Sequence, residues 1–211
     1  MKYALIRAVQ SARTIQGQKR STWVRRFYAL LTPVYDFTFL KLPGYRQAAQ
    51  DLIMRLEVDV SDAALDAGCG TGLLTLPLAK QARQTIGLDL SPAMLQKLAD
   101  KAAGQGITLE LHEGSVLDLP FDDGEFTLVT TAFMLLYLTP EEKQRAMSEI
   151  CRVLTPDGRL GCLSSQGEIA DIFLTRQAWQ TLLSDAGFTN VHIEDCYDVF
   201  RRVTTQKEEM T

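Results

Sequence analysis

The stretch Leu65-Asp66-Ala67-Gly68-Cys69-Gly70-Thr71-Gly72 decides the fold that we expect for this chain of 211 residues. A short apolar run from Ala63 leads into it, and apolar residues at helical spacing follow from Leu73 to Ala79. The glycines between the two runs favour a tight turn, because glycine adopts backbone conformations that other residues avoid. Strand, glycine turn and helix in this order predict a nucleotide-binding βα unit.

The spacing of the glycines argues against a dinucleotide as the ligand of this turn. The dinucleotide fingerprint needs Gly or Ala at the position that Leu73 occupies here. Asp66, two residues before the first glycine, would also repel a bound phosphate. It would attract a positively charged ligand, and S-adenosylmethionine, with its ammonium and sulfonium groups, is such a ligand. A tight strand-to-helix turn without any ligand is the alternative.

The segment from Asp66 to Gly72 resembles the first motif of the class I methyltransferases, an acidic residue followed by Gly-x-Gly-x-Gly. The resemblance extends roughly from Tyr28 to Val203, and its specific parts are this loop and Asp89. It implies S-adenosyl-L-methionine as the cofactor. It also implies an α/β fold: a Rossmann-like, seven-stranded, mostly parallel sheet with helices on both faces, a C-terminal antiparallel hairpin and an N-terminal helical arm.

The second specific motif follows the strand predicted over 84–89. Asp89 lies 89 − 72 = 17 positions beyond Gly72, close to the interval of about 20 at which an acid accepts ribose hydroxyls. Ser91 and Pro92 then favour the start of a helix. The run from Asp89 to Leu95 closely resembles the second motif of the family, and a simple capping role for Asp89 is the alternative.

The third motif departs from the family, which usually has Gly-Asp-Ala where this chain has Gly114-Ser115-Val116. The Ser115 hydroxyl can still accept a hydrogen bond from the adenine amine, but a bond without the charge is weaker by roughly 1 kcal/mol. The resemblance thus implies a set of cofactor-binding residues: Asp66, Gly68, Cys69, Gly70, Gly72, Asp89, Leu90, Met94, Ser115, Val116 and Thr131.

Apolar patterning predicts the other elements. Helices are expected over 1–15, from 21 or 22 to 31, and over 45–56, 140–154 and 175–186; strands are expected over 107–111, 126–131, 159–164, 191–196 and 199–205. In the family, the segment 132–138 crosses the mouth of the cofactor site. It lacks the Asn/Asp-Pro-Pro-Tyr tetrapeptide of enzymes that methylate nucleobase amines, which argues against that activity.

The N-terminal residues differ in charge from the rest of the chain. Residues 1–46 hold nine Lys and Arg against Asp36, a balance of 9 − 1 = +8, so residues 47–211 balance to −4 − 8 = −12. We therefore expect a basic, aromatic arm or lid over 1–46 and a methyltransferase domain over 47–211. Tyr28 and Tyr35 match the lid of ubiquinone/menaquinone-type and phospholipid methyltransferases, so that Tyr28, Tyr35 and Phe133 are acceptor or lid candidates. Aromatic side chains that only pin the arm to the core are the alternative.

Bulk features narrow the functional classes. The 46% hydrophobic and 23% charged residues are ordinary for a globular protein, and no apolar run is long enough to span a bilayer. The scattered cysteines predict neither a zinc site nor a disulfide framework. An apolar signal core is absent, so we expect a cytoplasmic protein, peripheral to the inner face of the membrane if the arm binds anionic lipid.

These patterns lead to a functional hypothesis with open alternatives. The expected activity is methyl transfer from S-adenosylmethionine to a small lipophilic or membrane-associated acceptor, quinone-like or phospholipid-like. Alternatives are a soluble small-molecule acceptor and a cofactor-binding module without turnover; nucleic acid is the weakest candidate partner. No acid–base pair is signalled, and His112 and His192 fall in predicted strands, so catalysis by alignment is expected. The sequence does not identify the acceptor, the accepting atom or the oligomeric state.

Overall fold

The computed structural model of the protein describes residues 15, 18–39, 41–167 and 172–208. The helix predicted over 1–15 lies outside the described residues, apart from its last position. The first described helix is α2, Gln18–Phe39. Within the described part of the chain, no helix combines the length and the apolar character that crossing a membrane requires.

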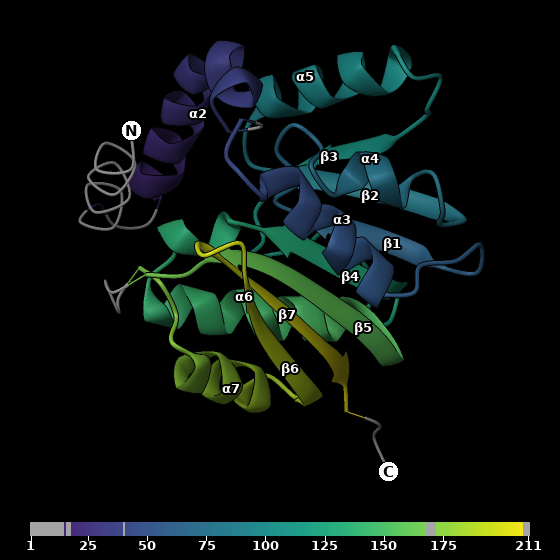
Figure 1. Ribbon diagram of the computed structural model, residues 1–211, viewed down its shortest axis with the longest axis vertical. Coiled ribbons are helices and arrows are strands. Elements are labelled where there is room, and N and C mark those ends of the chain that lie inside the picture. Colours follow the sequence, from purple (N-terminus) through teal and green to yellow (C-terminus); the bar gives the residue numbers. More distant parts are fainter. Residues whose placement is uncertain (1–14, 16–17, 40, 168–171, 209–211) are drawn as a thin grey trace.

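A mixed sheet forms the centre of the molecule (Figure 1). Its seven strands are β1 Ala63–Ala67, β2 Gln84–Asp89, β3 Glu110–Glu113, β4 Phe126–Ala132, β5 Leu154–Ser165, β6 Phe188–Cys196 and β7 Phe200–Lys207. They are ordered β3-β2-β1-β4-β5-β7-β6. Strands β1 to β5 pair in parallel, and β7 pairs antiparallel with β5 and β6. The predicted Rossmann-like sheet and its C-terminal antiparallel hairpin are confirmed.

Helices cover both faces of the sheet (Figure 1). One face carries α3 Tyr45–Arg55, the short α4 Thr75–Leu78 and α5 Pro92–Ala103; the other carries α6 Pro140–Val153 and α7 Arg176–Asp185. The largest fully buried side chains of α6 and α7 include Met147, Ile150 and Trp179, which pack on the sheet. Strand β1 lies between β2 and β4 inside the sheet and is buried along its whole length. The glycine turn at its carboxyl end therefore lies in the middle of the fold.

Helix α2 is longer than predicted. We expected it to run from 21 or 22 to 31 and to stop at Thr32-Pro33, but it begins at Gln18 and continues through Pro33 to Phe39. A proline inside a helix costs about 3 kcal/mol, since it removes one backbone hydrogen bond and crowds the preceding turn. Here the Thr32 hydroxyl donates a hydrogen bond to the Tyr28 carbonyl at 2.6 Å. Pro33 itself lies on the exposed side of the helix. Beyond Pro33, Asp36 in the next turn pairs with Lys97 and Lys101 of α5.

Strand β3 begins later than predicted, at Glu110 instead of Ile107. The Ile107 amide bonds the Ala102 carbonyl at 2.9 Å, and Gly106 has a φ of 68°. This pattern is a Schellman motif, which closes the C-terminus of α5 and uses Ile107 as its last residue. The apolar residue after the glycine therefore ends the helix instead of starting the strand.

Candidate functional site

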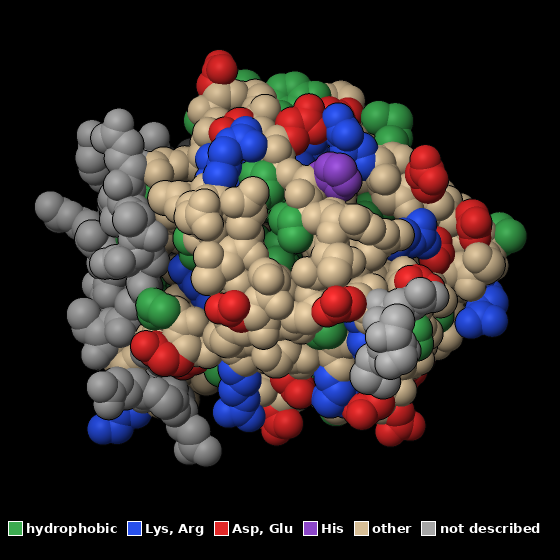
Figure 2. Space-filling model, turned by 90° about the horizontal axis from the view of Figure 1, so that it is seen from below, with side chains coloured by type: hydrophobic (Ala, Val, Ile, Leu, Met, Phe, Trp, Pro, Cys, Tyr) green, Lys and Arg blue, Asp and Glu red, His purple; other side chains and the backbone are tan. Residues whose placement is uncertain are grey.

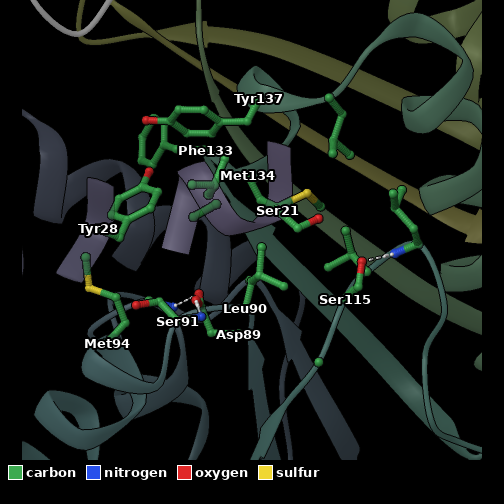
Figure 3. Close-up of a pocket in the computed structure, with 18 of the residues that line it drawn as sticks. Ser21, Tyr28, Asp89, Leu90, Ser91, Met94, Ser115, Phe133, Met134 and Tyr137 are labelled. Carbon is green, nitrogen blue, oxygen red and sulfur yellow. Dashed lines mark hydrogen bonds between the residues drawn. The ribbon is translucent and has the colours of Figure 1, made fainter. Parts of the chain in front are cut away.

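A cavity lies between α2 and the carboxyl ends of the central strands (Figure 3). About 920 Å³ of space between its walls is free of protein atoms, a figure that includes open solvent at the mouth. Helix α2, the glycine turn, the end of β2, the loop after β3 and the segment after β4 all contribute to its wall. The lining residues are Ser21, Val24, Tyr28, Tyr35, Gly68, Gly70, Asp89, Leu90, Ser91, Met94, Gly114, Ser115, Val116, Leu117, Ala132, Phe133, Met134, Tyr137, Leu138 and Glu142.

Asp89 places a carboxylate at the floor of this cavity. Its Oδ2 accepts the Gly70 amide and its Oδ1 the Ser91 amide, each at 2.8 Å (Figure 3). A carboxylate oxygen can accept two hydrogen bonds, so each oxygen keeps capacity for a ligand hydroxyl. Burial raises the pKa of Asp89, against the effect of the backbone hydrogen bonds. The site is therefore a desolvated acceptor held in a fixed orientation.

Bare backbone borders the carboxylate. Gly68 and Gly70 have φ values of 80° and 52°, a region that favours glycine. A Cβ on Gly70 would meet no atom within 4 Å, so it would project into open space at the cavity wall. A Cβ on Gly68 would lie 2.9 Å from Met134. The turn thus keeps one position open for a ligand and another closed by packing.

Aromatic side chains form the opposite wall. The Tyr28 and Tyr137 rings meet edge to face (Figure 3), with centroids 5.6 Å apart. The Tyr35 ring lies 6.0 Å from that of Tyr28, between centroids. Phe133 stacks on Tyr45 at 5.3 Å. Burial raises the pKa of Tyr28, Tyr35 and Tyr137. These phenols are therefore neutral hydrogen-bonding groups in an apolar wall.

The loop after β3 brings the third predicted motif to the same cavity. Ser115 and Val116 line it together with Leu90 and Met94. The Ser115 hydroxyl accepts the Leu117 amide at 3.2 Å (Figure 3). The structure thus gathers these four residues from distant parts of the chain, as the resemblance implied, around an apolar slot with one hydroxyl.

Asp66 does not reach the cavity. Its side chain is buried between β1 and α4, where its two oxygens accept the Thr75 hydroxyl at 2.6 Å and the Thr130 hydroxyl at 3.0 Å. Burial raises the pKa of the Asp66 carboxyl to about 6. Direct attraction of a cationic ligand by Asp66, the role we expected, has no contact surface here.

Three other residues of the expected set also lie outside the cavity wall. Cys69 is buried against β2, and burial raises the pKa of its thiol. A Cβ on Gly72 would lie 2.4 Å from Leu98 Cδ1, so this glycine allows α5 to approach the loop. Thr131 is buried beside a smaller void behind Phe133. Their places in the structure point to packing.

Sequence reasoning missed several wall residues, above all Ser21, Val24, Met134, Tyr137 and Leu138. Ser21 and Val24 share one face of α2 with Tyr28, and helical spacing could have identified them. Met134 and Tyr137 lie on a 3₁₀ turn, Met134–Tyr137, after a left-handed Phe133 with a φ of 59°. The resemblance placed the segment 132–138 across the mouth of the site, but nothing in the sequence identified which of its side chains face the cavity.

A polar cluster that the sequence did not reveal fastens α2 to the glycine loop. Asp36 Oδ1 accepts the Thr71 hydroxyl at 2.6 Å, and Asp36 Oδ2 lies 3.4 Å from the ammonium groups of both Lys97 and Lys101. Lys97 also bonds the Thr32 carbonyl at 2.6 Å. We call Asp36, Thr71, Lys97 and Lys101 the latch.

Burial and ion pairing act against each other on the charged groups of the latch. Burial alone would raise the pKa of Asp36, but the Thr71 hydrogen bond and the two lysines hold it below its usual value. Burial also lowers the pKa of Lys101, against the attraction of Asp36. The desolvation of Lys101 thus cancels part of its ion pair, and the hydrogen bond from Thr71 is the stronger link.

The described residues that line the cavity include no histidine and no metal-ligand cluster. The described residues contain no cluster of three or more His, Cys, Asp or Glu that could hold a metal ion. His112 pairs with Glu110 at 2.7 Å in β3, and His192 lies in β6; neither lines the cavity.

Comparison with known proteins gives this architecture a family. A methyltransferase domain family matches residues 64–158. The demethylmenaquinone methyltransferase of Lactobacillus johnsonii is 40% identical over 149 residues, 67% of this chain and 60% of the relative. The same enzyme of Lactiplantibacillus plantarum is 33% identical over 164 residues, 74% of this chain and 68% of the relative.

Solved structures share the fold at low sequence identity. The [4+2]-cyclase SpnF has a TM-score of 0.79 at 20% identity, covering 90% of this chain and 97% of its own. The magnesium protoporphyrin IX methyltransferase of Synechocystis, solved with bound S-adenosylmethionine, has a TM-score of 0.71 at 18% identity, covering 89% and 97%. The fold supports more than one chemistry, so the sequence relatives decide the family. The chain belongs to the class I S-adenosylmethionine-dependent methyltransferases of the menaquinone-methyltransferase-like type, whose cofactor is S-adenosylmethionine.

Proposed function

We propose that the protein transfers a methyl group from S-adenosylmethionine to a small, lipophilic, quinone-like acceptor. The observation that carries the proposal is the aromatic wall of Tyr28, Tyr35, Phe133 and Tyr137 opposite Asp89 in one cavity. Flat apolar molecules bind well between such rings. The relatives named as demethylmenaquinone methyltransferases support the same acceptor class.

The residues of the floor fit the cofactor. Asp89 has spare acceptor capacity on both oxygens for the two ribose hydroxyls, and the open side of Gly70 leaves space next to them. Ser115 is available for the adenine amine, with Leu90 and Met94 beside the ring. When bound, S-adenosylmethionine supplies an electrophilic methyl group on its sulfonium. Asp66 would act on it only at a distance, through the rigidity that it gives to β1 and α4.

The chain contributes alignment and exclusion of water. Asp89 and Glu142 are the only carboxylates among the described lining residues, and Glu142 accepts the Thr139 amide at 2.9 Å to cap α6. Neither is placed as a dedicated base, which favours an acceptor that is already electron-rich, such as a hydroquinone. The hydroxyls of Tyr28 and Tyr137 bond each other, which leaves one of the two hydrogens to donate to an acceptor oxygen and orient the ring. Positioning of this kind supplies much of the rate of methyl transfer.

Residues 1–46 are proposed to act as a lid and as the part that meets the membrane. Helix α2 carries the cavity-facing side of this segment, and its positive balance suits an anionic surface. A phospholipid-like acceptor would use the same surface. A soluble acceptor, or binding of the cofactor without turnover, are the competing functions, the latter because the fold also serves a protein named as a cyclase.

Radiolabelled methyl transfer tests the proposal. Purified protein with methyl-labelled S-adenosylmethionine should label a reduced short-chain demethylmenaquinone analogue in preference to thiol, simple phenol or phosphatidylethanolamine pools. Tyr137→Phe should raise the KM for the acceptor several-fold and leave cofactor affinity unchanged, since one donor to the acceptor is lost. Exclusive labelling of another pool would refute the acceptor class. Cofactor binding with no labelled product in any pool would show a binding module instead.

A further inference from the structure

The outward side of α2 exposes apolar residues in a line. Leu30, Val34 and Phe37 are 84%, 51% and 69% exposed. Their spacing of four and three residues places them on one side of the helix. Tyr28 and Tyr35, which line the cavity, lie on the opposite side. One helix therefore presents the site on one face and an uncovered apolar line on the other.

Cations flank this line. Lys19 and Arg26 precede Leu30 at helical spacing on the same side, and all three are exposed. Beyond the helix end, the Lys41 ammonium lies 3.5 Å from the centroid of the Phe37 ring. The only acid in α2 is Asp36, which is turned toward α5 in the latch. The face is thus apolar in the middle and positive at both ends.

The charge pattern selects the occupant of this face. A second copy packed on it around a two-fold axis would bring the same cations together, whereas anionic headgroups would pair with every one of them. One other face differs: in Figure 2, which shows the side that is lowest in Figure 1, acidic and basic side chains are interspersed. A helix with an apolar line edged by Lys and Arg is the usual form of an element that lies in a lipid interface.

We propose that this face docks on an anionic lipid bilayer. We call it the α2 stripe and define it by six residues: Lys19, Arg26, Leu30, Val34, Phe37 and Lys41. The proposal deepens the proposed function, because Ser21, Val24 and Tyr28 of the same helix line the cavity. The cavity would then lie within about one helix diameter, roughly 10 Å, of the lipid. A lipophilic acceptor could enter without crossing bulk water.

Vesicle co-sedimentation of the full chain tests the docking. Vesicles of phosphatidylcholine and phosphatidylglycerol in equal parts should bind the protein, and pure phosphatidylcholine should bind it much less. Leu30→Asp should weaken partitioning about tenfold or more, since it replaces an inserted apolar side chain by a charge that the surface repels. The double variant Arg26→Gln/Lys41→Gln should lose roughly 25-fold, about fivefold per charge. High salt should remove that difference.

Val60→Asp is the matched control. Val60 is 81% exposed and lies before β1, at the amino ends of the strands and so opposite the cavity, so its replacement should not change vesicle binding. Unchanged unfolding midpoints would show that both aspartate variants fold. Equal binding by Leu30→Asp and the parent chain, or equal loss with Val60→Asp, would overturn the proposal. A dimer in light scattering that Leu30→Asp abolishes, without vesicle binding, would assign the stripe to a second copy and overturn it too.

Methyl transfer in detergent separates this proposal from the proposed function. Leu30→Asp should keep the parent rate with a detergent-dispersed demethylmenaquinone analogue and lose rate only when the acceptor is in vesicles. Absence of vesicle binding with full activity in detergent would refute the docking alone.

Discussion

Removal of the Asp36 carboxylate should release α2 from the body of the protein. The hydrogen bond from Thr71 to this charged acceptor is worth about 1.5–3 kcal/mol. The pairs with Lys97 and Lys101 are partly exposed, at 25% and 30% of the lysine side chains, so each adds at most about 1 kcal/mol. Asp36→Ala should therefore favour the undocked helix by about 2–4 kcal/mol, a factor of roughly 30 to 1,000.

Asp36→Asn should have a smaller effect, because its amide oxygen still accepts the Thr71 hydroxyl. Loss of the charge alone costs about 1 kcal/mol, a factor of roughly five. The parent latch should hold at neutral pH. The pKa of Asp36 is lowered in the folded protein, so the contribution of its ionised carboxylate to stability is complete above the unfolded pKa of about 3.9. That contribution is lost only as the pH falls through the lower folded value.

Hydrogen exchange measured by mass spectrometry checks this prediction. Peptides from 18–39 should exchange faster in Asp36→Ala by the factor above, with a smaller increase in Asp36→Asn. Cofactor affinity, measured by calorimetry, should fall once the closed fraction drops below one half. Asp100→Asn is the matched control, since that exposed α5 carboxylate accepts only from Gln96, at 2.9 Å, among the described contacts. Unchanged exchange in α2 would refute the latch, and faster exchange throughout β4 would show global destabilisation instead.

Three further predictions concern the floor of the site and the glycine turn. Asp89→Ala should weaken S-adenosylmethionine binding by about 2–4 kcal/mol in calorimetry, because two ribose hydroxyls lose a charged acceptor. The affinity of the parent protein should also fall in acid, since burial raises the pKa of Asp89. An affinity that does not change between pH 4 and 7 would contradict this. Asp66→Asn should gain stability relative to the parent as pH rises. The pKa of the parent carboxyl is about 6 in the folded protein and about 3.9 in the unfolded chain. Its ionisation therefore costs the folded state up to about 3 kcal/mol above pH 6 and nothing below pH 4. Urea unfolding at pH 4.5 and 8 measures the difference, and a constant difference would refute it. Gly72→Ala should destabilise the protein by about 2–4 kcal/mol, since its Cβ would lie 2.4 Å from Leu98 at a φ of 91°. The control Gly106→Ala, with a φ of 68° and no atom within 4 Å, should cost only about 1 kcal/mol. Equal losses in thermal unfolding would contradict the packing argument.

Most of the fold and the floor of the site were predictable from the sequence because their signals are local. The left-handed turns at Gly68, Gly70 and Gly72 need glycine at those positions, and Asp89 follows its strand directly. Leu90, Met94, Ser115 and Val116 lie in or beside contiguous motifs, and the cavity wall contains them all. Apolar patterning also predicted the seven strands that the structure contains, although β3 begins three residues later than predicted, β6 three residues earlier and β5 five residues earlier.

Tertiary structure alone decided how the remaining polar groups are used. Asp66 contacts Thr130, 64 residues away, because the parallel pairing of β1 with β4 puts the two residues side by side. The same carboxylate also accepts the hydroxyl of Thr75 in α4. Asp36 meets Thr71 across 35 residues and Lys101 across 65. A carboxylate removed from water needs partners whose distance along the chain is unconstrained, and such partners contact the last turn of α2 beyond Pro33. Local conformational preference is written in neighbouring residues, whereas desolvation and pairing depend on which surfaces the fold brings together.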